Sequence, residues 1–143
     1  MIELSASDFS ISPPQIAIRE WWQALINIEA TFCITIGKIQ MIQEPHFCVV
    51  ELVNALRCWE ASSNYLSDFE YESMNEEETE LLWFQLTSED RWLVGSAWQQ
   101  TECPDPVSTQ ALKTAIHIFN KSVEQSVAND LGVYLMDFKE FAA

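Results

Sequence analysis

Hydrophobic and polar residues alternate over residues 25–36, which read LINIEATFCITI. The apolar positions of this pattern are Ile28, Ala30, Phe32, Ile34 and Ile36. The polar positions between them are Glu29, Thr31, Cys33 and Thr35. A period of two residues is typical of a β-strand with one buried face. Gly37 and Lys38 then predict a tight turn, and the following IQMIQ predicts the second strand of a hairpin.

The next apolar pattern has the spacing of a helix. Its apolar residues recur every three or four positions, and they are Val49, Leu52, Val53, Leu56 and Trp59. This spacing predicts a helix from His46 to about Ser62 with one apolar face. We expect Pro45 to open the helix, because a proline in the first helical turn costs no hydrogen bond.

Three strands are predicted next, over residues 68–74, 80–87 and 91–100, with polar turns between them. Ser108 then predicts the N-cap of a second helix, and Gly132 predicts its end. The apolar stripe of this helix is Leu112, Ala115, Ile116, Phe119, Val123, Val127 and Leu131. We expect the tail VYLMDF to add a strand or to pack on the core.

These elements follow the order ββαβββα. They predict an α+β fold, in which two helices pack on one face of a mainly antiparallel sheet. With 143 residues, of which 48% are hydrophobic, the chain is expected to form a single domain over residues 1–143. Residues 1–20 are expected to be an N-terminal arm. The sequence leaves the oligomeric state open.

The chain is strongly acidic, with 22 acids, 7 bases and a net charge of −15. Such a charge repels nucleic-acid phosphates and anionic membranes, and it attracts cationic surfaces. No base lies between Arg57 and Arg91, but ten acids do: Glu60, Asp68, Glu70, Glu72, Glu76, Glu77, Glu78, Glu80, Glu89 and Asp90. Solubility alone would predict evenly spread charge. The clustering therefore points to a cationic protein partner, with a merely solubilising charge as the main alternative, and the sign of the charge argues against nucleic acid.

The chain shows no secretory signal and no apolar run long enough to span a membrane, so we expect a cytoplasmic protein without membrane association. Its four cysteines show neither a CxxC motif nor zinc-site spacing. Cys48 and Cys58 lie ten residues apart on one predicted helix, about 15 Å apart and beyond disulfide reach. We expect four free thiols, as in a reducing cytoplasm.

No catalytic, metal-binding or cofactor-binding pattern is readable. His46 and His117 lie outside any HExxH motif, and a GxSxG serine motif is absent. The run Glu76–Glu78 does not match a calcium-binding EF-hand loop. Gly95 falls inside a predicted strand, which indicates a bulge or a close contact. We therefore expect a binding protein rather than an enzyme.

The tryptophans fall into two groups. Trp59, Trp83, Trp92 and Trp98 have strand or helix spacing and are expected mostly in the core. Trp21 and Trp22 are adjacent, so both cannot face the same side of a strand. We expect one of them to be exposed or covered by the N-terminal arm.

Residues 67–100 carry a composite motif that resembles a group of small acidic bacterial proteins. The pattern is FEYxSM, an acidic run, LWF, and then WxxGSxWQ. The matching residues here are Phe69, Glu70, Tyr71, Ser73, Met74, Leu82, Trp83, Phe84, Trp92, Gly95, Ser96, Trp98 and Gln99. In size, charge and α+β build, the chain also resembles the immunity proteins of bacterial polymorphic toxin systems, including contact-dependent growth inhibition.

This resemblance implies tight binding to one cognate toxin domain, often a basic nuclease, and it carries over no catalytic residue to this chain. Acids would speed the association, and aromatic side chains, or buried rings supporting them, would give affinity. The expected partner-binding residues are Asp68, Glu70, Tyr71, Glu72, Glu76, Glu77, Glu78 and Glu80. Two alternatives stay open: a small-molecule-binding module with a tryptophan-lined pocket, and an enzyme that uses clustered carboxylates.

Overall fold

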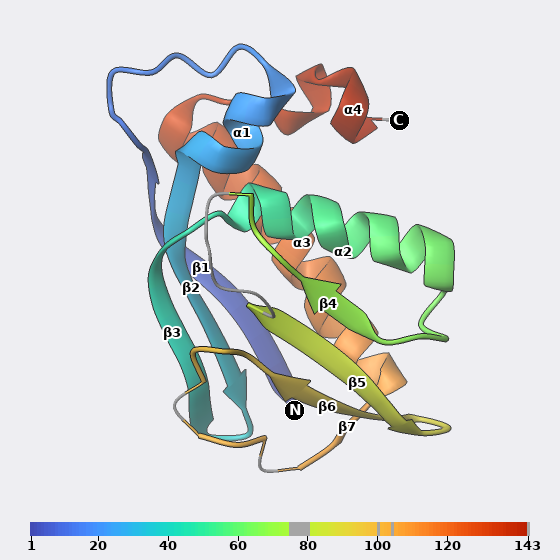
Figure 1. Ribbon diagram of the computed structural model, residues 1–143. Helices are drawn as coiled ribbons and strands as arrows, with labels where there is room; N and C mark the ends of the chain where they lie inside the picture. The colour runs from blue at the N-terminus through green and yellow to red at the C-terminus, as the bar shows by residue number, and fades with distance from the viewer. Residues whose placement is uncertain (75–80, 100, 104, 143) are drawn as a thin grey trace.

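The computed structural model describes residues 1–74, 81–99, 101–103 and 105–142. Its elements follow one another along the chain (Figure 1). In order, they are β1 (Ile2–Ile11), α1 (Trp21–Asn27), β2 (Ile28–Ile36), β3 (Ile39–Phe47), α2 (Val49–Ser63), β4 (Phe69–Tyr71), β5 (Leu82–Ser88), β6 (Arg91–Gly95), β7 (Val107–Ser108), α3 (Thr109–Leu131), the short 3₁₀ helix η1 (Leu135–Asp137) and α4 (Lys139–Ala142).

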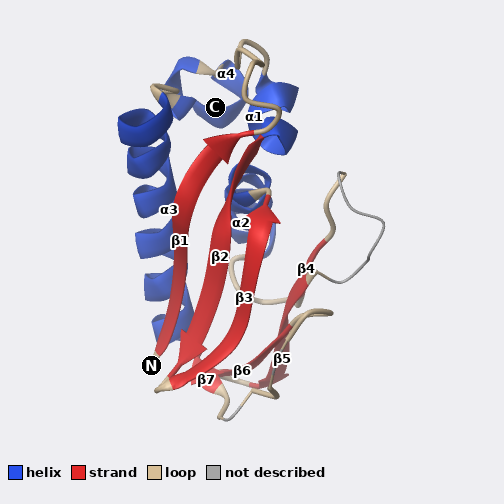
Figure 2. Cartoon of the chain, turned by 90° about the vertical axis from the view of Figure 1, so that its left-hand side faces the viewer, coloured by secondary structure: helices blue, strands red, loops and turns tan. Residues whose placement is uncertain are grey.

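The strands form two sheets. One has the order β1-β2-β3 and the other has the order β4-β5-β6-β7. Neighbouring strands in both sheets run antiparallel. Figure 2 shows the three-stranded sheet face-on, with α2 and α3 on the side away from the viewer. The structure thus confirms the α+β class and the antiparallel pairing, but the strands form two sheets where one was predicted.

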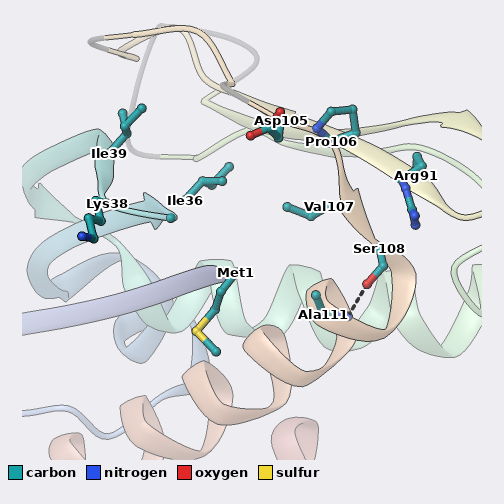
Figure 3. Close-up of a pocket in the computed structure, with 11 residues that line it drawn as sticks. Met1, Ile36, Lys38, Ile39, Arg91, Asp105, Pro106, Val107, Ser108 and Ala111 are labelled. Carbon is teal, nitrogen blue, oxygen red and sulfur yellow. Dashed lines mark hydrogen bonds between the residues drawn. The ribbon is translucent and has the colours of Figure 1, made fainter.

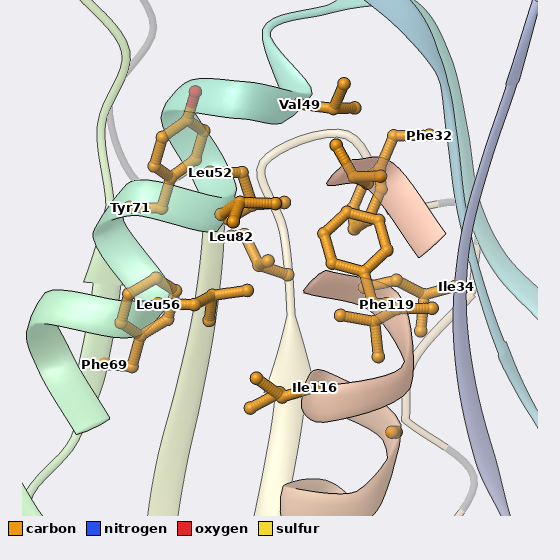
Figure 4. Packing of buried hydrophobic residues seen from close by; sticks show 14 of the residues in the cluster. Phe32, Ile34, Val49, Leu52, Leu56, Phe69, Tyr71, Leu82, Ile116 and Phe119 are labelled. Atoms are coloured by element: carbon orange, nitrogen blue, oxygen red, sulfur yellow. The ribbon is translucent and has the colours of Figure 1, made fainter. Parts of the chain in front are cut away.

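Both sheets and both long helices share one core. Figure 4 shows part of this core, in which labelled side chains from β2, α2, β4, β5 and α3 face one another. Phe32 and Phe119 make an edge-on ring contact with centroids 5.5 Å apart. Burial of such large apolar side chains stabilises a fold by about 1.5–3 kcal/mol each. The core therefore holds the two sheets in one arrangement.

The predicted N-terminal arm over residues 1–20 is wrong for its first half. Residues 2–11 form β1, which pairs with β2 in the register Ile2↔Ile36 and Leu4↔Ile34. Ile2 and Leu4 are buried, as the alternation with Glu3 and Ser5 requires. The serines weaken this hydrophobic pattern, and for that reason the strand is hard to recognise from the sequence.

Two boundaries near the first hairpin also differ from expectation. Residues 25–27 end α1, so the strand predicted over 25–36 begins only at Ile28. Pro45 lies in β3 and does not open the helix, which begins at Val49. β3 pairs only with β2, and an edge strand tolerates a proline because its outer side needs no N–H donor.

The second helix is confirmed at both ends. The Ser108 hydroxyl accepts a hydrogen bond from the Ala111 N–H at 3.1 Å. Gly132 has the positive φ of 66° that ends many helices. The tail packs on the core through Leu135 and Phe141, and it adds no strand. Two further helices, α1 and α4, and the strands β1 and β7 make the observed order richer than ββαβββα.

Candidate interaction surface on the four-stranded sheet

The expected partner-binding residues divide into three groups. Asp68, Glu70 and Glu72 are exposed, with Asp68 just before β4 and Glu72 just after it. Tyr71 is buried. The other four, Glu76, Glu77, Glu78 and Glu80, lie outside the described residues. The structure therefore brings three of the expected acids to the surface at one strand.

Tyr71 is part of a buried polar network. Its hydroxyl donates a hydrogen bond of 2.7 Å to Oε1 of Glu51, which lies in the first turn of α2. The other carboxylate oxygen, Oε2, accepts the backbone N–H of Met74 at 3.2 Å. Burial raises the pKa of Tyr71 strongly, and the Glu51 charge raises it further. Tyr71 thus supports the β4 region from below and offers no surface for a partner.

The outer face of this sheet carries a row of three residues. In the strand register Glu70 lies opposite Trp83, and Trp83 lies opposite Gly95. Their neighbours Phe69, Leu82 and Phe84 point into the core. Trp83 is half-buried, so the expectation that it belongs to the core is only partly met. Its alternation with Leu82 and Phe84 is the sequence signal that places it on the outer face.

Gly95 allows the Trp83 ring to lie across the sheet. A Cβ added to Gly95 would come within 1.9 Å of Cζ2 of Trp83, which is far too close for real atoms. The indole therefore occupies the space where a side chain of β6 would stand. The close contact expected at this glycine is confirmed.

A shallow hollow of about 270 Å³ adjoins this ring. Its lining consists of Asp68, Phe69, Glu70, Trp83, Phe84 and Gln85. Asp68 is held in place because its Oδ1 accepts the Leu86 N–H at 2.8 Å. We call the outward-facing set Asp68, Glu70, Trp83 and Gln85 the Trp83 surface. It combines a large aromatic ring with two carboxylates and, among these described lining residues, no base.

The rest of the WxxGSxWQ motif builds a turn. The Ser96 hydroxyl donates to the Leu81 carbonyl at 2.5 Å and accepts the Trp98 N–H at 3.0 Å. The Ser96 N–H donates to the Gln99 side chain at 2.9 Å. The predicted strand over 91–100 ends at Gly95 because this turn takes over the backbone. Several motif residues thus hold the fold, whereas Glu70 and Met74 are exposed and Trp83 is half-buried.

Two other hollows lie at the far end of the molecule. One, of about 500 Å³, separates the β2–β3 turn from β7, and Lys38 and Arg91 lie on opposite sides of it (Figure 3). The other, of about 540 Å³, lies between β1 and α3. No tryptophan is among the residues that line either hollow. Trp59 and Trp92 are instead packed together in the core, with ring centroids 5.7 Å apart.

The histidines make separate acid contacts. His46 Nδ1 lies 3.3 Å from Glu29. His117 Nε2 lies 2.5 Å from Oε2 of Glu60, which also accepts the Tyr65 hydroxyl at 2.7 Å. Burial alone would raise the pKa of Glu60, but Tyr65, His117 and Lys113 together lower it. Within the described ranges, no group of three or more histidine, cysteine or acidic side chains is placed to hold a metal ion.

No disulfide joins any of the four cysteines. Cys48 is buried, Cys58 is exposed, and Cys33 and Cys103 are partly buried. The adjacent tryptophans also differ in exposure. Trp21 packs on Phe138 and Phe141, and Trp22 is 55% exposed on α1. No helix in the part of the chain that the structure describes is both long and apolar enough to cross a membrane.

Comparison with models of protein families gives a match over most of the chain. The model of a domain of unknown function, DUF7878, matches residues 6–129, which include the second half of β1, the strands β2 to β7, α1, α2 and most of α3. No curated protein and no solved structure matches the chain. Because the match covers most of its length, the chain belongs to the DUF7878 family.

Proposed function

We propose that this protein is an immunity-type binding protein that neutralises a cognate bacterial toxin domain with a cationic, nuclease-like surface. It acts in the cytoplasm, where it covers that surface and shuts substrate out. The observation that carries the proposal is the Trp83 surface. A half-buried tryptophan lies there beside the carboxylates of Asp68 and Glu70, on a sheet face that carries no helix.

The ring and the acids have different tasks in this proposal. Tryptophan is one of the side chains that most often dominate the energy of protein interfaces. Asp68 and Glu70 would meet lysine or arginine side chains around it. The net charge of −15 raises the rate at which a cationic partner arrives. A protein that must capture a nuclease before it cuts gains from fast association.

The buried network below the surface favours a rigid binding site. Tyr71 and Phe69 alternate with Glu70 along β4, and both are fixed in the core. Tyr71 is held by Glu51, and Phe69 stacks near Phe84 with ring centroids 5.2 Å apart. A preorganised surface loses less conformational entropy on binding, so more of the contact energy appears as affinity.

The test starts from the neighbouring gene, which we expect to encode a large protein ending in a toxin-like domain. That terminal domain is expressed from an inducible promoter, with and without this protein. We expect growth arrest without it, growth with it, and a complex that co-purifies. Growth arrest in both cultures, with both proteins soluble, would overturn the proposal.

Matched variants locate the interaction on the molecule. Trp83→Ala and Glu70→Lys alter the Trp83 surface. The control for the tryptophan is Trp22→Ala, at an exposed position on α1. The control for the acid is Asp130→Lys, which likewise replaces an exposed acid by lysine, in the last turn of α3. We expect the first pair to lose protection and the second pair to keep it. Equal protection by all four would remove the Trp83 surface from the proposal.

A further inference from the structure

β1 is an edge strand, because it pairs only with β2 in the three-stranded sheet. Along β1, the backbone N–H and C=O groups of successive residues point alternately toward β2 and away from it. The Gly37 N–H donates to the Met1 carbonyl at 2.7 Å, and the register continues as Ile2↔Ile36 and Glu3↔Thr35. In an antiparallel pair, hydrogen-bonded and non-hydrogen-bonded residues alternate. Glu3, like Met1, therefore directs its backbone groups toward β2.

The alternate residues of β1 direct their backbone groups away from β2. The N–H and C=O groups of Ile2, Leu4 and Ala6 point to the open edge of β1. No hydrogen bond to these groups is found among residues 1–74, 81–99, 101–103 and 105–142. Such a row of unpaired donors and acceptors is a template for another strand.

The open edge borders the groove between β1 and α3, which run alongside each other (Figure 2). This groove has a volume of about 540 Å³. Its residues are Met1, Ile2, Glu3 and Leu4 from the β1 segment, and Ser108, Gln110, Ala111, Thr114, Ala115 and Ile118 from α3 and its cap. Small side chains on α3 leave the space open, and Ile118 is 63% exposed.

The side chains that line the groove carry charge of one sign. Glu3 is the charged side chain among the described residues that line it, and it is exposed. A segment lying in the groove would meet backbone groups on one side, apolar side chains on the other, and a carboxylate at the rim. These three features fit an extended peptide with apolar residues at alternate positions and a basic residue near Glu3.

We propose that the groove between β1 and α3 binds an extended, basic and apolar peptide segment that adds a strand to the edge of β1. The alternate apolar side chains face α3, and a lysine or arginine side chain reaches Glu3. The site is separate from the Trp83 surface and does not rest on the proposed function. A second copy of this chain fits less well, because Glu3 and Asp8 give β1 acidic charge alone.

The probe is a display library of random eight-residue peptides held between flexible linkers. It is selected on the wild-type protein and on Thr114→Trp, which fills the groove from an exposed position on α3. Ser122→Trp is the matched control, since Ser122 is exposed on the same helix and does not line the groove. Melting curves check that both variants fold.

We expect enriched peptides with alternating apolar residues and excess lysine or arginine. They should bind the Ser122→Trp variant as they bind the wild type, and bind Thr114→Trp at least tenfold more weakly. The amide resonances of Ile2, Leu4 and Ala6 should shift most on binding. Glu3→Lys should reverse the preference from basic to acidic peptides, whereas Asp130→Lys should leave it unchanged.

Three results would overturn the proposal. One is a selection that enriches no sequence above the Thr114→Trp background. Another is a set of peptides that bind Thr114→Trp as tightly as they bind the wild type. The third is a concentration-dependent dimer whose shifted amides lie on β1, because the edge would then be occupied by a second copy.

Discussion

The indole ring of Trp83 occupies the place where a side chain of Gly95 would stand. A Cβ on Gly95 would lie 1.9 Å from Cζ2 and 2.3 Å from Cε2 of the ring. The two residues face each other in the register of β5 and β6. A glycine in a strand weakens it, but an aromatic side chain across the pair covers the exposed backbone. The position of Trp83 on the outer face therefore depends on Gly95.

Gly95→Ala should displace the Trp83 ring. Because the ring is half-buried, it can swing outward, so we expect a loss of stability of about 1–3 kcal/mol rather than unfolding. The measurements are a denaturant melt and the indole N–H resonance of Trp83. Trp83→Leu combined with Gly95→Ala should recover most of the loss. An unchanged resonance in the single variant would contradict the account.

Tyr71→Phe should destabilise the β4 region from within. It removes the hydroxyl that donates to the buried Glu51 carboxylate, and such an unsatisfied group costs about 1–3 kcal/mol. Chemical denaturation measures this loss. Tyr134→Phe is the control, because Tyr134 is 59% exposed. Equal stability of the two variants would mean that the network contributes nothing.

The Glu60 contacts predict a dependence of stability on acid pH. Its pKa is lowered in the folded state, so the folded protein favours the carboxylate over the acid. That stabilisation is present above the ordinary pKa of 4.5 and is lost as the pH falls through the lowered value. Glu60→Gln should therefore lose stability at neutral pH and match the wild type more closely in acid.

Melting temperatures across the acid range test this. The difference between wild type and Glu60→Gln should shrink as the pH falls below about 4. Asp130→Asn serves as the control for removing an acid on a helix, since Asp130 is exposed on α3. A gap that stays constant across the whole range would contradict the pKa direction.

The sequence predicts best where local rules decide the structure. Ser108 and Gly132 mark the ends of α3, because a capping hydroxyl and a positive φ are requirements of the backbone itself. The alternation over 28–36 marks β2, because one face of that strand is buried and the other is not. These features need no knowledge of distant contacts.

Other features depend on the tertiary arrangement. Pro45 can sit in β3 because β3 is an edge strand, which a local pattern does not reveal. Glu51 looks like a solvated helix residue, yet it is 7% exposed and accepts hydrogen bonds from Tyr71 and Met74. Within the FEYxSM motif, Tyr71 faces the core and Glu70 faces outward, as the alternation of the strand predicted over 68–74 implies. What the sequence did not reveal is that the Tyr71 hydroxyl has a buried partner in Glu51.

In the proposed function, the Trp83 surface binds a cationic toxin domain. The most direct test measures association and dissociation rates of that domain with Trp83→Ala and Glu70→Lys, beside Trp22→Ala and Asp130→Lys. Glu70→Lys should slow association more than Asp130→Lys does, chiefly at low salt. Trp83→Ala should weaken binding by about 30-fold or more, mostly through faster dissociation. Wild-type rates in both surface variants, with unchanged melting curves, would contradict the account.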